Sequence, residues 1–305
     1  MKPASPLSTV WISIPLWMLA SCVAAQEGLR DTTELGSVLG LKVLLSSEDV
    51  VSASRYESDS EFDFETQQLG LRWRLGDHRW LPFLGVFAGR YVDDLSTAST
   101  ATTFEAVTGG VEAGAEVLLA GANHRSGWFL EPRAAVGTSW IERRETVRFD
   151  GEEGPAGVDG STADARALTM LASLGLGRRW ESPGRWRLEG LTSLWWLRTD
   201  PHSVDAPLID RHQTSTHLRL QLSVVLPLTA TFSGRALELA AGLVHTELDD
   251  DFAEHLAVDR MTEASLSLLT RFRDGAFPVG AFGLAVRYLD ADSFDGWTLG
   301  VTVSD

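Results

Sequence analysis

The connections between the strand-like segments of this chain alternate in length, and this rhythm constrains the fold more than any single motif does. Short turns rich in turn-forming residues, such as 76–79 and 182–185, alternate with long stretches such as 142–166, apart from a short final loop. Soluble proteins have no reason to shorten every second connection, whereas a transmembrane β-barrel has short periplasmic turns and longer outer loops. The alternation therefore predicts such a barrel, with its long loops outside the cell.

Twelve segments alternate between apolar and polar residues with a period of two, as strands do because successive side chains face opposite sides. In the eighth segment Leu218, Leu220 and Leu222 share one face, opposite His217 and Arg219. Most segments reach the length of about 9–11 residues that a tilted strand needs to cross a bilayer. We expect an all-β fold, a transmembrane antiparallel up-and-down β-barrel with 12 strands at 35–46, 62–75, 80–91, 103–119, 128–141, 167–180, 186–198, 214–226, 236–248, 262–272, 277–289 and 297–303.

Aromatic residues recur at both ends of the predicted strands. Trp180 and Trp186 flank the turn at 182–185, whereas Trp140 and Trp196 lie at the opposite strand ends. Amphipathic rings at both interfaces form the aromatic girdles of membrane barrels. The third segment fits least well, because it is apolar on both faces and its Trp80 falls on the wrong parity.

The first residues indicate export. Residues 1–25 read as a signal peptide, with Lys2 as a thin positive region followed by an apolar stretch. Cleavage before Gln26 suits ordinary signal peptidase, but the residues leading to Cys22 also match a lipobox, in which that cysteine would be lipidated. A short periplasmic segment is expected at 26–34 and the barrel at 35–305. The mature chain then has no disulfide.

The net charge of −16 argues against a nucleic-acid partner, because phosphate binding calls for a basic face. The long loops are acidic, as at Asp249 and Asp251. They could bridge lipopolysaccharide phosphates through divalent cations, or only keep the outer surface solvated. We expect outer-membrane lipid and lipopolysaccharide as partners, and neither a cofactor nor a metal site nor a known small-molecule ligand.

The polar faces of the strands carry charges of both signs, which we expect to point into the lumen. Buried charges must be paired or hydrated, so two interpretations stay open. The charges form ion pairs that fill a narrow lumen, or they line a water-filled pore as a selectivity filter. The candidate lining residues are Arg72, Arg74, Glu112, Glu116, Glu131, Arg133, Arg187, Glu189, His217 and Arg219, with Glu238, Glu263, Arg271 and Arg287 in addition.

No catalytic constellation stands out. Asp200 and His202, the pair Asp93 and Asp94, and the pair at 290 and 292 could superficially supply a protease site at the barrel mouth. A barrel phospholipase needs a serine beside an activating histidine, and neither a G-x-S-x-G elbow nor such a cluster occurs. We therefore expect no enzyme activity.

Strand number, the segment LGLRWRLGDHRW at 69–80 and the closing segment GWTLGVTVSD at 296–305 resemble solitary outer-membrane autotransporter-like β-barrel proteins. The resemblance covers about 35–305 and implies a barrel without a secreted passenger, inserted by the barrel assembly machinery. Two features depart from the family pattern. The chain ends on Val303, Ser304 and Asp305 rather than on an aromatic residue, and only 26–34 precede the first strand where autotransporters have a pore-threading helix.

These observations favour a bacterial outer-membrane protein with a structural or translocator-like role and no fused passenger to secrete. The alternative is a narrow, porin-like diffusion channel for small polar solutes. A surface hydrolase is the third and weakest reading.

Overall fold

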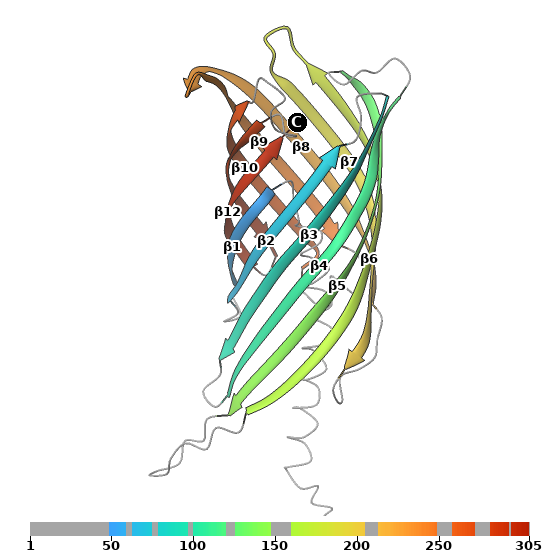
Figure 1. Cartoon of the computed structure of the whole chain (residues 1–305), viewed down its shortest axis with the longest axis vertical. Coiled ribbons are helices and arrows are strands. Elements are labelled where there is room, and N and C mark those ends of the chain that lie inside the picture. Colours follow the sequence, from blue (N-terminus) through green and yellow to red (C-terminus); the bar gives the residue numbers. More distant parts are fainter. Residues whose placement is uncertain are drawn as a thin grey trace, which may run out of the picture.

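The computed structural model describes residues 49–58, 63–74, 79–96, 100–119, 126–147, 160–204, 213–248, 258–271, 281–292 and 294–304. Within these ranges the chain forms a single closed barrel of twelve strands (Figure 1). The strands are β1 (Asp49–Ser58), β2 (Asp63–Arg74), β3 (Trp80–Ser96), β4 (Thr100–Leu118), β5 (Gly127–Val147), β6 (Gly160–Glu181), β7 (Arg187–Val204), β8 (Gln213–Phe232), β9 (Arg235–Leu248), β10 (Arg260–Arg271), β11 (Ala281–Ala291) and β12 (Phe294–Ser304).

Each strand pairs antiparallel with its neighbours in the chain, and β1 pairs antiparallel with β12 to close the barrel. The closing register runs from Val51 opposite Val301 to Ser58 opposite Phe294. The predicted fold class is confirmed. No described helix is long and apolar enough to cross a membrane.

The predicted position of the first strand differs from the structure. The predicted strand at 35–46 lies outside the described residues, and the loop expected at 47–61 is wrong because β1 occupies much of it. Ser52, Ser54 and Tyr56 are buried on the inner face, while Val51 and Arg55 face outward. The strand is hard to recognise in the sequence because its outer face carries little apolar surface to contrast with the inner one.

The strands also extend beyond their predicted ends on one side of the barrel. The loop expected at 92–102 shrinks to 97–99, because β3 and β4 continue to Ser96 and from Thr100. The same happens in the β5–β6 hairpin, whose strands reach far below the rest of the barrel in Figure 1. Strict alternation of long and short loops is therefore wrong, and on the opposite side β8 runs past its predicted end at 226 to Phe232. We call the side with the β3–β4 and β5–β6 connections the hairpin end, and the side with the connections after β2, β4, β6, β8 and β10 the turn end.

The two faces of the strands follow the predicted parity. In β8, Leu220 and Leu222 are 43% and 49% exposed on the outside, whereas His217 is 1% exposed on the inside. The same alternation holds in β6 and in the described part of β12. The barrel therefore presents an apolar outer surface and a more polar interior, the reverse of a soluble fold.

Both aromatic girdles are present among the described residues. Trp128 and Trp140 face outward from β5, Trp128 beside its first residue and Trp140 twelve residues farther along the strand. At about 3.3 Å per residue and a tilt of roughly 40°, they are about 30 Å apart along the barrel axis. This separation matches the hydrocarbon thickness of a bilayer. Trp80 also faces outward, 62% exposed, so the parity assigned to the third segment was wrong.

The inner face of β3 can carry large aromatic side chains because glycines on the neighbouring strand leave room for their rings. Phe83 and Phe87 point into the lumen, and a Cβ atom added at Gly114 or Gly110 would collide with these rings. Phe129 stands in the same relation to Gly177. Close ring-on-backbone packing explains why β3 is apolar on both faces: one face meets lipid and the other packs inside.

This parity predicts opposite fates for two adjacent substitutions in β8. Leu220→Arg places a charge in lipid and costs about 2–4 kcal/mol near the midplane, whereas Gln221→Arg points into the polar interior. Urea titration of each variant in lipid vesicles, followed by heat-modifiable gel mobility, should show a large loss of stability for Leu220→Arg only. Equal stability of the two variants would contradict the register of β8.

Candidate functional site

The lumen at the turn end is crossed by charges that neutralise one another. Arg179 donates through two nitrogens to both carboxylate oxygens of Glu116, at 3.0 and 3.1 Å, and through Nε to Glu189 at 2.6 Å. Its guanidinium also lies over the ring of Phe129, 4.9 Å from the centroid. Because Glu116 and Glu189 come from β4 and β7, this one arginine ties three strands together across the interior.

A second group of charges lies at the same end on the following strands. The carboxylate of Glu238 accepts from Arg271, at 3.0 Å, and is 3.4 Å from a nitrogen of Arg187. Glu238 is buried, so the two arginines supply the compensation that a buried carboxylate needs.

Arg179 is the central residue of this network, and it is absent from the residues predicted to line the lumen. It shares the inner parity of Gly175 and Gly177 in β6, which was the signal that could have identified it. The neighbouring Arg178 faces outward, so only strand parity distinguishes the two arginines.

Farther along the lumen, two arginines pack against one aromatic residue. The guanidinium groups of Arg133 and Arg219 lie over the ring of Trp195, 5.2 and 5.6 Å from its centroid. Arg133 also donates to Glu131 at 2.8 Å and lies 3.9 Å from Glu112. Trp195 faces the interior and was likewise missed, because its neighbour Trp196 fits the outer girdle.

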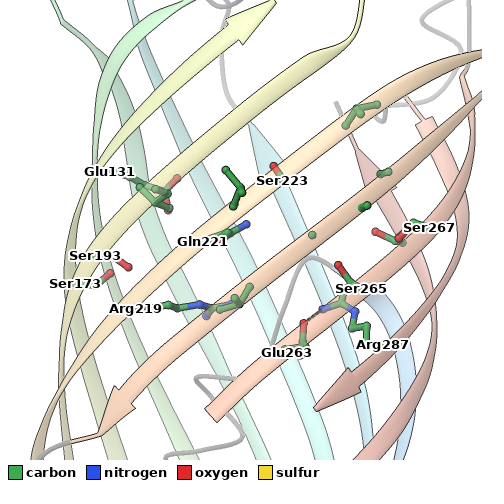
Figure 2. A pocket seen from close by; sticks show the side chains of 18 of the residues that line it. Glu131, Ser173, Ser193, Arg219, Gln221, Ser223, Glu263, Ser265, Ser267 and Arg287 are labelled. Carbon is green, nitrogen blue, oxygen red and sulfur yellow. Dashed lines mark hydrogen bonds and ion pairs between the residues drawn. The ribbon is translucent and has the colours of Figure 1, made fainter. Parts of the chain in front are cut away.

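A cavity of about 160 Å³ opens beside this cluster. Figure 2 shows its polar walls: Glu131, Arg219 and Gln221 on one side, and the ion pair of Glu263 with Arg287 on the other. That pair is 3.2 Å long. Several hydroxyl groups complete the lining, from Ser173, Ser193, Ser223, Ser265 and Ser267.

Toward the hairpin end the interior turns apolar. One cluster of buried side chains draws on strands from around the whole barrel: Tyr56, Tyr91, Ala106, Leu171, Trp195, Leu197, Leu248, Val258, Met261, Leu289 and Phe294. Hydroxyl pairs accompany it, such as Thr108 with Ser139 at 2.9 Å. His217 is fully buried here, and its Nε2 is hydrogen-bonded to the hydroxyl of Ser215 at 2.9 Å. We call this cluster the apolar layer.

For two of the predicted lumen residues, the side chains lie outside the described part of the structure. Arg72 and Arg74 lie in β2, but their side chains are outside the described part, as is Cys22 altogether. Within the described residues, no group of three or more His, Cys, Asp or Glu is arranged to hold a metal ion.

Two of the carboxylates considered for a hydrolytic site have structural partners. The Nε–H group of Arg198 donates a bifurcated hydrogen bond to the two carboxylate oxygens of Asp200, at 2.9 and 3.0 Å. Asp292 accepts from the backbone N–H groups of Asp259 and Arg260 and from the Arg260 side chain. Desolvation opposes ionisation of Asp292, but these hydrogen bonds outweigh it and lower its pKa below the usual range. A carboxylate held in this way fastens the β9–β10 connection to the β11–β12 turn.

Comparison with solved structures places the chain among bacterial outer-membrane barrels. It is similar to the β-domain of the Bordetella autotransporter BrkA (18% identity, TM-score 0.51), over 84% of this chain and 97% of that one. It is also similar to the translocator domain of autotransporter NalP from Neisseria meningitidis (12% identity, TM-score 0.51), over 95% and 99% of the two chains. The transport unit of autotransporter AIDA-I from Escherichia coli matches with 13% identity and a TM-score of 0.50, over 90% and 98%.

No family model matches the sequence, and no curated protein matches it. At these identities the structural likeness establishes a shared barrel fold. The resemblance to autotransporter barrels is thus confirmed at the level of architecture.

The turn-end network predicts a large stability effect from one substitution. Arg179→Met leaves the buried Glu116 uncompensated, which should cost about 3–5 kcal/mol. As a matched control, Arg198→Met breaks the more exposed pair with Asp200 and should cost at most about 1 kcal/mol. Urea titrations in vesicles provide both values, and similar losses in the two variants would contradict a central role for Arg179.

Proposed function

We propose that this protein is an outer-membrane barrel whose lumen is closed at rest, with a structural or translocator-like role and no enzymatic activity. The observation that carries the proposal is the content of the lumen. Ion pairs occupy its turn end and the apolar layer occupies its hairpin end.

These two layers oppose ion passage by different physical means. At the turn end, Arg179 and Glu238 each hold partners from other strands, so an entering ion must displace charges that already satisfy one another. In the apolar layer the buried side chains are mainly aromatic and aliphatic, and narrow hydrophobic constrictions exclude water. The cavity between them is polar, but it lies between two barriers.

The translocator-like part of the proposal draws on the three autotransporter barrels, which include a translocator domain and a transport unit. In such a role the lumen contents described here would have to rearrange while a chain passes. The ion pairs of Arg179 join β4, β6 and β7 across the lumen. Because they cross the path of a passing chain, they are the contacts that must open first.

The rival function, a narrow diffusion channel, is favoured by the polar cavity lined by Arg219, Gln221 and Glu263. It requires a continuous water path through both layers. Conductance of the refolded chain from Gln26 onward in a planar lipid bilayer separates the two functions. We expect inserted barrels without stepwise conductance, because the lumen is closed at both levels.

Removing bulk from the apolar layer should open it. The double variant Tyr91→Ala with Leu197→Ala deletes two fully buried side chains of that layer, and we expect it to show larger currents than the wild type. The matched control, Leu218→Ala with Leu220→Ala, removes apolar bulk from the outer face and should stay silent. Stable, stepwise wild-type currents would overturn the closed-lumen proposal and establish the channel.

A further inference from the structure

An arginine on the lipid-facing surface at the turn end lies between two tryptophans. The guanidinium carbon of Arg178 is 5.1 Å from the ring centroid of Trp128 and 4.7 Å from that of Trp180. Both rings belong to the aromatic girdle and are partly exposed, 45% and 37%. The cation is therefore held at the edge of the apolar belt instead of extending freely into water.

The surface beside Arg178 is recessed. In the sheet register Arg178 is opposite Trp128 on β5 and opposite Gly190 on β7. A Cβ atom added at Gly190 would meet nothing closer than 3.9 Å, from the backbone of Gln221. One flank of the guanidinium is thus walled by aromatic rings, and the other is left open by a residue without a side chain.

The outer surface at the turn end is also basic. Among its described residues the outward-facing charges are all arginines, at 79, 178, 185 and 235. At the hairpin end, in contrast, the outer arginines Arg90 and Arg144 have carboxylate partners, Glu105 at 2.7 Å and Glu142 at 2.6 Å. Among the described residues Arg178 contacts aromatic rings alone, which leaves the N–H edges of its guanidinium suited to an anion.

We propose that Arg178, Trp128, Trp180 and the recess at Gly190 bind the phosphate of an anionic glycerophospholipid in the leaflet at the turn end. A guanidinium is weakly hydrated, stacks on aromatic rings and binds phosphate oxygens in pairs, which suits a boundary between headgroups and acyl chains. Leu176, two residues along the same outer face, is 46% exposed and lies where the acyl chain of that lipid would continue. A soluble phosphate would gain nothing from this apolar neighbour.

Native mass spectrometry of the refolded barrel in mixed micelles of phosphatidylglycerol and phosphatidylcholine tests the site. The wild type should retain phosphatidylglycerol preferentially. Arg178→Gln should lower that preference about fivefold, the equivalent of the ~1 kcal/mol that one basic residue contributes near an anionic lipid surface. Arg90→Gln removes an outer arginine at the hairpin end and should leave the preference unchanged.

Two further variants separate the parts of the site. Gly190→Leu keeps the arginine but fills the recess, so phosphatidylglycerol retention should fall while heat-modifiable mobility still shows a folded barrel. Arg178→Lys keeps the charge but loses the planar stacking, and intermediate retention is expected. Unchanged lipid preference in Arg178→Gln would overturn the proposal, as would full displacement of the lipid by excess inorganic phosphate, which would assign the site to the free anion.

Discussion

Backbone hydrogen bonding between β1 and β12 is the interaction on which the rest of the structure depends. Hydrocarbon offers no partner to a backbone N–H or C=O group, so a sheet in a bilayer must have no edge. Here β1 pairs over residues 51–57 with β2 on one side and with β12 on the other. This requirement explains why a weakly apolar segment becomes a strand. Its chief contribution is the backbone N–H and C=O groups that close the barrel.

Closure at twelve strands then determines what the inner side chains can be. A small barrel has little interior volume, so its inner residues must fill it. Rings such as Phe83 and Phe129 fit because glycines face them on neighbouring strands. Charges such as Glu116 and Arg179 fit because each cancels the other. The closed lumen proposed above thus depends on this inner composition.

The sequence predicted the strands whose two faces differ in polarity because one of them meets lipid. It failed where the two faces of a strand are alike. The outward-facing residues of β6, β8 and β12 could be identified from the sequence, because lipid requires apolar residues on one face while the lumen accepts polar ones. Periodicity measures the contrast between two faces, and that contrast vanishes when both are polar, as in the hairpin-end extensions of β5 and β6. It also vanishes in β3, where both faces are apolar, so Trp80 was misassigned. Cross-strand partners such as Glu116 and Arg179 are 63 positions apart, and no local pattern pairs them.

The two surfaces of the barrel wall differ in what their charges do. Inner carboxylates such as Glu116, Glu238 and Glu263 lie within ion-pair distance of arginines, so their charges are compensated within the protein. On the outside of the described turn end, the charged side chains are all arginines. Arg178 is oriented there by tryptophans and not by a carboxylate. A cation positioned by aromatic rings keeps most of its attraction for an anion, because the rings neutralise none of its charge. The lipid site proposed for Arg178 therefore joins a cation without a carboxylate partner among the described residues to the headgroup layer, in which lipid phosphate is abundant.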